Sequence, residues 1–416
     1  MSGQTRLIYL ANARMPTEKA HGAQIAQMCE SFLLAGCDLE LWYPDRDEPE
    51  EAKSIPLRAY YGLSRDIPTR QIPCLDLMTV LYHAGLRGKL VDKLSFRLRT
   101  YSLLAVLAWR AWREHRRAPD TLFYMRDLTL AKGLPRLLPA SFRRRMVVEV
   151  HALSPDSETR RRQVATLSQV GAVVALTATM KRDMVASGLP EARILVAHDA
   201  FNQRLFAAPP SRAEARARLG LPAEGRIAAY VGRYLQLNKE KGIPDIIAAA
   251  PAMLAACPDL RFLFVGGPLD RVPHYQGLIA ALGLPAERFA FHDKRPMAEV
   301  PAWCAAADLL LMPYPQDPQY AANLSPLKMF EYMACHRPIL ASALPSIGEI
   351  LQDGTNAALC APSDPPSLAR RAIEVLNTPS LGEKLAERAA RDVSTLTWDN
   401  RARHILDFIV PHLERT

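Results

Sequence analysis

Short apolar runs alternate with longer amphipathic segments along the first half of the chain. The apolar runs predict buried strands at Arg6–Ala11, Leu39–Tyr43, Thr121–Met125, Met146–Val150 and Ala172–Leu176. A helix is predicted from Ala23 to Ala35, where Gly36 ends it. Strands that alternate with helices in this way predict parallel βαβ units with helices on both faces of a sheet.

The same alternation returns in the second half. Strands are predicted at Ile227–Val231, Arg261–Val265, Phe289–Phe291, Leu309–Met312 and Ile339–Ala341. Helices are predicted around Pro244–Ala256, Tyr275–Leu282, Met297–Ala307 and Pro326–Ala334, and the tail from Trp398 is helical. Residues 206–225 are rich in Pro, Ala and Arg and have no strand pattern, so they are interpreted as a linker. We therefore expect an N-terminal α/β domain over 1–205, a second one over 226–395 and a final helix over 396–416.

The composition is that of a packed globular protein. Hydrophobic residues make up 49% of the 416 residues and charged residues 23%. The 7 cysteines are odd in number and form no C-x-x-C pair, which predicts a reducing cytosol and disfavours a zinc ribbon. The apolar run near the N-terminus is too short for a secretory signal, and Leu103–Trp109 is far shorter than the roughly 20 residues that span a bilayer. We expect a cytoplasmic protein.

The net charge of +9 is concentrated in residues 87–117. The cations there are Arg87, Lys89, Lys93, Arg97, Arg99, Arg110, Arg113, Arg116 and Arg117, against Asp92 and Glu114. One interpretation is a core helix with a solvated face. The other is adsorption to anionic lipid on the inner face of the cytoplasmic membrane, to which Trp109 and Trp112 are suited. Nucleic-acid binding is not expected, because no motif that reads DNA or RNA accompanies the charge.

The most specific motif runs from Asn323 to Ala334. Ser325 is a favourable N-cap and Pro326 suits the first position of a helix. The free amides and the dipole of a helix start favour a phosphate. Glu331 follows on the second turn, where it can reach the hydroxyls of a ribose. The alternative is an ordinary amphipathic helix with a solvated Glu331.

A second motif follows the strand Ile227–Val231. Gly232 allows a turn that delivers Arg233, and Lys241 precedes the next helix. Two cations at the carboxyl end of a parallel sheet suit a diphosphate, although loop cations can also be plain surface charge. Lys239 is the alternative to Lys241. Gly266 ends the strand Arg261–Val265 in a third turn that allows close backbone approach.

In this order the three motifs resemble the C-terminal domain of the retaining glycosyltransferases of family 4, the glycosyl transferases group 1, which have the GT-B fold. The resemblance implies two Rossmann-like domains that face each other across a cleft, with the final helix crossing back to the N-terminal domain. In that family an Arg and a Lys bind the donor diphosphate, and a Glu-x7-Glu motif binds sugar and ribose. It implies donor contacts from Gly232, Gly266, Asn323, Leu324, Ser325, Pro326 and Leu327.

The first half carries further matches to the family. Pro16–Gly22 is similar to its first βα loop, which implies a donor contact at Gly22 and an acceptor side formed by Lys19 and His21. Val147–His151 is similar to the strand whose terminal His lies beside the donor sugar, and Ile194–Asp199 is similar to the last strand before the linker.

The chain departs from the family pattern at two places. Asn323 replaces the first Glu of the Glu-x7-Glu motif, and Arg233 and Lys241 are three residues further apart than is usual. An amide can bond a sugar hydroxyl but cannot supply negative charge to a developing oxocarbenium ion.

The resemblance implies a hexosyltransferase-type enzyme that needs neither a metal nor a bound cofactor. It would move a sugar, with retention, from a UDP- or GDP-linked donor to a hydroxyl of a glycan or lipid-linked acceptor in bacterial glycolipid, polysaccharide or other glycoconjugate synthesis. His151, Arg233, Lys241 and Glu331 would be its catalytic residues. The alternatives are a nucleotide-sugar epimerase or a phosphorylase on the same fold, and a non-catalytic nucleotide-sugar-binding partner, which Asn323 keeps open.

Overall fold

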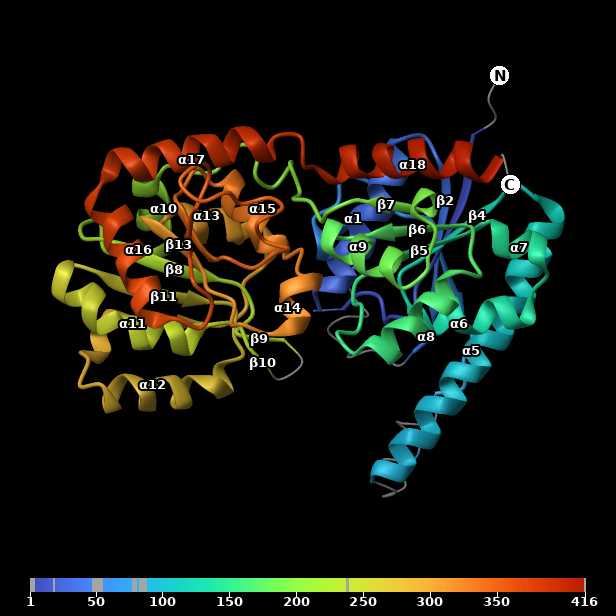
Figure 1. Cartoon of the computed structure of the whole chain (residues 1–416), viewed down its shortest axis with the longest axis horizontal. Helices are drawn as coiled ribbons and strands as arrows, with labels where there is room; N and C mark the ends of the chain where they lie inside the picture. The colour runs from blue at the N-terminus through green and yellow to red at the C-terminus, as the bar shows by residue number, and fades with distance from the viewer. Residues whose placement is uncertain are drawn as a thin grey trace. The chain divides into compact units, whose positions relative to one another are not determined.

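The computed structural model describes residues 4–17, 19–46, 55–76, 81, 88–236 and 239–414. The chain divides into two α/β units (Figure 1). Unit 1 comprises Met1–Leu176, Met180–Ala197 and Trp398–Thr416, and unit 2 comprises Thr177–Thr179 and His198–Thr397. Each unit contains one parallel sheet with helices on both faces, as the alternating pattern predicts.

Unit 1 contains a seven-stranded parallel sheet in the order β3-β2-β1-β4-β5-β6-β7. Its strands are β1 (Arg6–Leu10), β2 (Asp38–Pro44), β3 (Thr69–Ile72), β4 (Leu122–Met125), β5 (Met146–Val150), β6 (Ala172–Ala175) and β7 (Ile194–Val196). Its helices are α1 (Ala20–Leu34), α3 (Leu57–Tyr61), α5 (Lys89–Arg117), α6 (Leu128–Leu137), α7 (Ala140–Arg144), α8 (Ser157–Leu167), most of α9 (Ala178–Ala186), a 3-10 turn at Glu191–Arg193 and α18 (Trp398–Glu414).

The central strands of unit 1, β1, β4, β5 and β6, are almost entirely buried and largely apolar because both faces of the sheet are covered there. Ile8 and Leu10 of β1 belong to a core that includes side chains of α5, α6, α8 and α9. Tyr9 points to the opposite face, where its ring lies 5.2 Å from that of Tyr124 and where α1 and α18 pack together. Because these strands are buried on both faces, their continuous apolar runs could be predicted from the sequence.

The final helix α18 is part of unit 1, which confirms that the end of the chain crosses back to the N-terminal domain. The Ser31 hydroxyl of α1 donates to Asp399 of α18 at 2.7 Å. The Arg401 guanidinium lies 2.9 Å from the Glu149 carboxylate of β5, and their side chains are only 3% and 2% exposed. A buried ion pair therefore joins α18 to the sheet.

Unit 2 contains a six-stranded parallel sheet in the order β12-β11-β8-β13-β14-β15, and β9 (Leu235–Gln236) and β10 (Lys239–Glu240) form a separate hairpin. The sheet strands are β8 (Ile227–Val231), β11 (Arg261–Val265), β12 (Phe289–His292), β13 (Leu309–Met312), β14 (Ile339–Ser342) and β15 (Ala358–Cys360). The helices are α10 (Arg212–Leu219), α11 (Ile243–Ala256), α12 (Val272–Ala281), α13 (Val300–Ala305), α14 (Pro318–Asn323), α15 (Leu327–Ala334), α16 (Pro365–Asn377) and α17 (Pro379–Val393), with 3-10 turns at Leu269–Arg271, Ala286–Arg288 and Met297–Glu299.

The sheet of unit 2 is doubly wound about β8. Tyr230 packs in the core beside α11, α12 and α16, whereas its neighbour Val231 packs in the core beside α13 and α15. Later strands are added on both sides of β8, with β11 on one side and β13 on the other. In such sheets, ligands bind outside the carboxyl ends of the two strands at which the strand order reverses.

The two central strands separate before they end. β13 pairs with β8 at only two positions, Leu309 with Ala228 and Leu310 with Ala229. Beyond that point the Val231 amide donates to the Tyr332 hydroxyl at 2.7 Å, and this hydroxyl donates to the Val231 carbonyl at 2.9 Å. A side chain of α15 thus satisfies the backbone groups of Val231 at the end of β8, where β13 no longer pairs with it.

The segment expected as a linker, 206–225, differs from that expectation because it lies within unit 2 and contains α10. Ser211 and Glu214 form a capping box at its start. The inward-facing Arg216 is 2% exposed and pairs with Asp308 at 2.6 Å. The helix was missed because a buried arginine gives no apolar periodicity.

Residues 177–179 belong to unit 2, where they contact the Glu349 carboxylate and the Ala322 carbonyl. Glu349 accepts hydrogen bonds from the backbone amides of Ala178 at 2.7 Å and Thr179 at 2.8 Å, and it bonds His198 Nε2 at 2.8 Å. These donors lower the pKa of Glu349 to about 2 against the effect of its burial. The carboxylate also suits the start of a helix, where the dipole favours negative charge.

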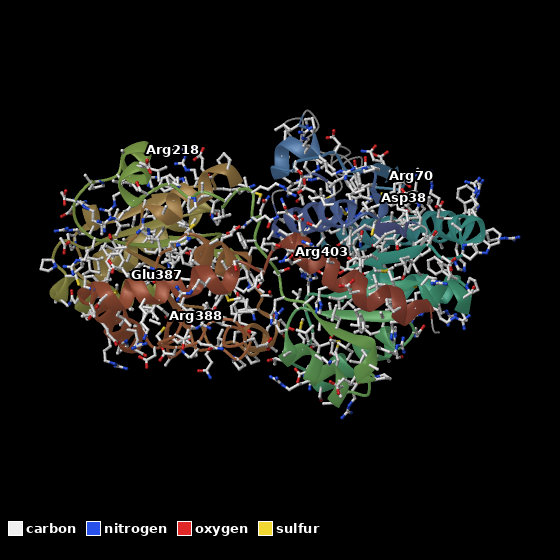
Figure 2. All side chains as sticks on the ribbon, turned by 90° about the horizontal axis from the view of Figure 1, so that it is seen from above. Asp38, Arg70, Arg218, Glu387, Arg388 and Arg403 are labelled. Carbon is white, nitrogen blue, oxygen red and sulfur yellow. The ribbon has the colours of Figure 1, made fainter. Side chains whose placement is uncertain are left out.

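Exposed charge covers the outer faces of the last two helices. Glu387 and Arg388 of α17 and Arg403 of α18 point away from their cores (Figure 2). No helix in the described part of the chain is long and apolar enough to cross a membrane.

Replacing Arg401 by Met is expected to lower the free energy of unfolding by about 3–5 kcal/mol, because Glu149 would remain buried without its counter-charge. The matched control is Arg403→Met on the same helix. That side chain is exposed, and its loss should change stability by no more than about 0.5 kcal/mol. Urea unfolding followed by tryptophan fluorescence measures both. Equal losses in the two variants would contradict the assignment.

Candidate donor site

The turn after β8 is shaped by two glycines in contact. Gly232 has φ 150° and donates its amide to the Val265 carbonyl at 2.7 Å. Gly266, at φ 135°, lies so close that a Cβ on it would be 2.4 Å from the Gly232 carbonyl oxygen. Gly266 therefore supports the Gly232 turn through close backbone packing. Arg233 follows this turn and its side chain is exposed.

The β9–β10 hairpin and the loop after it decide between the two candidate lysines. Lys239 Nζ lies 2.6 Å from Asp317, the N-cap residue of α14, so its charge is already compensated. Lys241 precedes Gly242, where a Cβ would lie 1.7 Å from the Pro313 carbonyl oxygen beyond β13. Burial and the nearby Arg233 lower the pKa of Lys241 to about 8. The geometry thus favours Lys241 as the partner of Arg233.

The start of α15 differs from the sequence expectation in one respect. The helix begins at Leu327 with Pro326 as its N-cap residue, and Ser325 does not cap it. The Ser325 hydroxyl instead accepts the buried Asp199 amide at 2.8 Å. Asn323 is the last residue of α14, a short helix that the sequence analysis did not predict. Because Pro326 has no side-chain donor or acceptor, the first amides of α15 keep their capacity to bind an anion.

Lys328 of α15 lies in the same part of unit 2, and the sequence analysis did not single it out. Its side chain is 7% exposed, and its Nζ lies 3.7 Å from the centroid of the Tyr230 ring and 4.9 Å from that of Tyr314. Among the described residues this Nζ has no hydrogen-bond partner. Burial and then the charge of Lys241 hold the pKa of Lys328 well below its usual range. The sequence did offer one signal for Lys328. It lies three residues before Glu331, so the two side chains share one face of the helix.

Glu331 lies on α15 as predicted. Burial raises the pKa of its carboxyl to about 7, and the Lys328 charge opposes that rise. Near neutral pH this group can therefore accept a hydrogen bond from a hydroxyl or donate one. Both capacities suit a ribose.

In unit 1, His151 follows the end of β5. Its Nε2 is hydrogen-bonded to the buried Glu149 carboxylate, which also accepts from the Tyr124 hydroxyl and from Arg401. Burial and then the charge of Arg126 lower the pKa of His151 to about 4. Because an ionised carboxylate cannot donate, His151 is neutral at pH 7 with its proton on Nε2, which leaves Nδ1 as an acceptor.

The first βα loop of unit 1 places the other predicted residues. Lys19 is the N-cap residue of α1, and Lys19 and His21 flank its start. Gly22 is buried below Tyr61, and a Cβ on it would lie 2.4 Å from the Tyr61 hydroxyl. That hydroxyl accepts the Thr17 amide at 2.6 Å. Gly22 is thus required because a larger residue would clash with Tyr61 inside unit 1.

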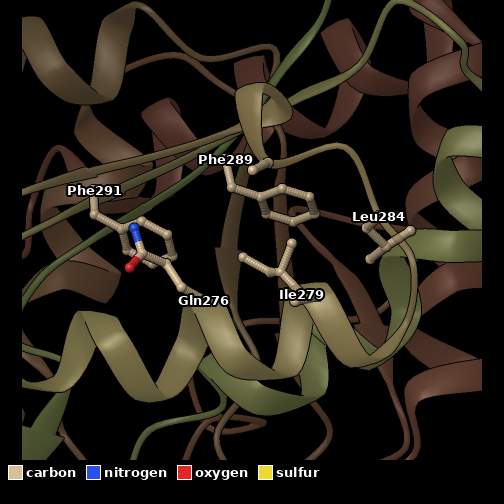
Figure 3. Close-up of a pocket in the computed structure, with 7 residues that line it drawn as sticks. Gln276, Ile279, Leu284, Phe289 and Phe291 are labelled. Atoms are coloured by element: carbon tan, nitrogen blue, oxygen red, sulfur yellow. The ribbon is translucent and has the colours of Figure 1, made fainter.

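Two further observations bear on ligands. An apolar cavity of about 100 Å³ lies between α12 and β12, lined by Ile279, Leu284 and Phe289 among others (Figure 3). It includes none of the predicted site residues, and it is best regarded as a packing gap. Within the described ranges, no group of three or more His, Cys, Asp or Glu side chains is placed to hold a metal ion.

Residues 225–378 match the family model described as Glycosyl transferases group 1. This part of the chain is therefore similar to the family. The match covers the segment that contains Arg233, Lys241, Lys328 and Glu331, so the motif resemblance and the family model agree on the same part of the molecule.

Among curated relatives, the chain is similar to D-inositol 3-phosphate glycosyltransferases. That of Thermobispora bispora is 30% identical over 254 residues, which are 58% of this chain and 56% of the relative. That of Streptomyces coelicolor is 32% identical over 206 residues, 47% of this chain and 43% of the relative. The aligned parts thus span about half the length of these relatives.

Solved structures show the same fold over nearly the whole chain. The Anabaena protein HepE in complex with UDP-glucose has a TM-score of 0.71 at 18% identity, with 97% of this chain and 99% of HepE covered. Sucrose-phosphate synthase from Thermosynechococcus elongatus has a TM-score of 0.74 at 18% identity, with 99% and 100% covered. The GT-B fold is thereby confirmed.

Replacing Glu331 by Gln is expected to remove a pH dependence of stability. Because the folded pKa of about 7 lies above the ordinary 4.5, this carboxyl's contribution is fully present below pH 4.5 and is lost as the pH rises through 7. The stability of the wild type relative to Glu331→Gln should therefore be greater at pH 5 than at pH 8, by up to about 3 kcal/mol.

Urea unfolding at the two pH values measures this difference. Glu383→Gln, which changes an exposed side chain of α17, is the control and should show no such difference. A wild-type advantage over Glu331→Gln that is the same at both pH values would contradict the raised pKa.

Proposed function

We propose that this protein transfers a sugar, with retention of configuration, from a UDP- or GDP-linked donor to an acceptor hydroxyl. The observation that carries the proposal is the crevice of unit 2 between the carboxyl ends of β8 and β13. Arg233, Lys241 and the start of α15 all follow or flank these two strand ends. This is where a doubly wound sheet binds nucleotides.

The proposed chemistry needs positive charge at this crevice. The bond between the anomeric carbon and the diphosphate breaks, and the diphosphate leaves with one more negative charge. The acceptor oxygen forms the new bond to the anomeric carbon and loses its proton. Arg233, Lys241 and the α15 amides stabilise the charge that develops on the diphosphate, and positioned groups of this kind often contribute the largest share of catalysis. Glu331 binds the ribose.

His151 is assigned to the sugar rather than to the diphosphate. Its Nδ1 is an acceptor, and Glu149 fixes the tautomer. A neutral imidazole suits a hydrogen bond from a sugar hydroxyl. This role rests on the family resemblance and on the neutral state of His151, which burial and the hydrogen bond to Glu149 impose.

Thermal-shift measurements against UDP, GDP, ADP, TDP and their sugars test the donor site. A ligand that binds only the folded state raises the melting temperature. One nucleotide series should stabilise the wild type, and Lys241→Ala and Glu331→Ala should abolish the effect. No shift with any nucleotide would overturn the proposed function. Stabilisation by a nucleotide sugar without product formation on mixed acceptors would favour the non-catalytic partner that Asn323 keeps open.

We further propose that the acceptor is presented at an anionic membrane surface, which α5 contacts. The stripe consists of Leu90, Leu94, Leu98, Tyr101, Trp109 and Trp112, which are between 38% and 70% exposed. Most are spaced by three or four residues and thus share one face of the helix, whose first half extends away from the sheet of unit 1 (Figure 1). Arg113 and Arg116 stack over Trp109 and Trp112 with guanidinium-to-centroid distances of 4.9 and 5.2 Å.

This combination fits lipid better than protein. Trp and Tyr suit the bilayer interface, and each Lys or Arg near an anionic surface adds about 1 kcal/mol. Lys93, Arg97, Arg113 and Arg116 lie along the flanks of the stripe, so apolar insertion and attraction to lipid phosphates act at the same face. Of the basic stretch 87–117, Arg87 lies outside the described residues.

Co-sedimentation with vesicles tests the contact. The wild type should bind vesicles that contain phosphatidylglycerol far better than pure phosphatidylcholine, and salt should weaken binding. Arg113→Gln with Arg116→Gln should lower partitioning roughly 30-fold, from about 1 kcal/mol per charge. Trp109→Ser with Trp112→Ser should lower it too, whereas the exposed control Leu137→Ser should not. Equal binding to both vesicle types, or self-association through α5 without lipid binding, would overturn the proposal.

A further inference from the structure

Three cations in the described residues have side chains that are at least nine-tenths buried, and two of them are compensated. Arg216 pairs with Asp308 and also donates to the backbone carbonyls of Ala223 and Ala306, and Arg401 pairs with Glu149. Lys328 differs, because its buried ammonium has no hydrogen-bond partner among the described residues. Burial of an unpaired charge is costly, so such a lysine gives up its proton more readily and keeps it where an anion pairs with it.

The surroundings of Lys328 show what would compensate it. Its Nζ lies against Tyr230 of β8 and Tyr314, which is two residues past β13, so it occupies the crevice between the two strand ends. Lys241 is near enough to lower the pKa of Lys328, and the start of α15 adds a positive dipole end. The acid that acts on it, Glu331, forms no ion pair with it within the described part of the chain. An anion is the missing partner.

We propose that Lys328 is a third cation of the donor site, which binds the diphosphate together with Arg233 and Lys241 and which the two tyrosine rings hold when no anion is present. The proposal rests on the proposed function, because it assigns a ligand group to the same site. A ring face stabilises an ammonium less than a charge-assisted hydrogen bond to an anion does. A diphosphate would therefore draw the ammonium from the rings.

Gly232 has a role in this arrangement. A Cβ on it would lie 3.4 Å from Lys328 Cδ and 3.7 Å from Nζ. Gly232 thus lies beside the Lys328 ammonium, and a side chain there would be in contact with it.

Titration calorimetry of UDP, UMP, GDP and GMP with the wild type, Lys328→Met and Lys328→Gln tests the proposal. Both substitutions should weaken binding of the diphosphate by about 10- to 100-fold, the range that one charge-assisted hydrogen bond provides. They should weaken the monophosphate much less, so that the ratio of the two dissociation constants falls. Lys384→Met, which removes the same charge from an exposed position of α17, should change neither.

A second measurement separates binding from structure. An anion that pairs with Lys328 and Lys241 raises both of their pKa values, so diphosphate binding at pH 8 should take up protons, as titrations in buffers of different ionisation enthalpy reveal. Lys328→Met should take up fewer protons. An unchanged affinity for the diphosphate in both variants would overturn the proposal. It would also be overturned if the affinities for diphosphate and monophosphate fell equally and the melting temperature of the variants fell too.

Inorganic pyrophosphate distinguishes this proposal from the proposed function. If the wild type binds pyrophosphate and Lys328→Met does not, while no nucleotide binds, the Lys328 assignment stands and the nucleotide-sugar function fails. If the wild type binds neither pyrophosphate nor any nucleotide, both are overturned.

Discussion

The geometry of the donor site depends on the double hydrogen bond between the Tyr332 hydroxyl and the backbone of Val231. Parallel strands that pair to their ends leave no room between them, and β13 stops pairing with β8 after Ala229. The tyrosine hydroxyl satisfies the Val231 amide and carbonyl, which this separation leaves without a strand partner. The same contact presses α15 against β8, which sets where Lys328 and Glu331 can lie.

The two units use buried charge in opposite ways. In unit 1, Glu149 accepts from Arg401, Tyr124 and His151, and this compensated charge joins the final helix to the sheet. In unit 2, Lys241 and Lys328 lie close together, each has a lowered pKa, and among the described residues neither forms an ion pair with a carboxylate. Compensated charge stabilises a fold, whereas accumulated charge of one sign is stabilised by a ligand of the opposite sign. This contrast is the physical reason for placing the diphosphate in unit 2.

Much of the fold was predictable, and the exceptions share a cause. β8, β11 and β13 have the predicted bounds because strands buried on both faces are continuously apolar. β3, with the sequence TRQI, was missed because three of its four residues are exposed at the edge of the sheet. The helix α10 was missed because its inward side chain, Arg216, is charged. Patterns of hydrophobicity report burial, so they fail where an element is exposed or where a buried residue is polar.

By itself the sequence determined the α/β class, the two domains, the positions of their central strands along the chain, and the placement of Arg233 and Lys241 after a strand and of Glu331 on a helix. These follow from local periodicity and from spacing along the chain. Only the tertiary structure decided which lysine is compensated and that Ser325 bonds Asp199 rather than capping α15. It also decided that Lys328 lies against two tyrosine rings with no hydrogen-bond partner among the residues that the structure describes. Lys239 and Asp317 are 78 residues apart in the sequence, and Asp199 and Ser325 are 126 residues apart. Tyr230 and Lys328 are 98 residues apart. Distances of that kind are set by how the strands pair, and a linear pattern carries no information about them.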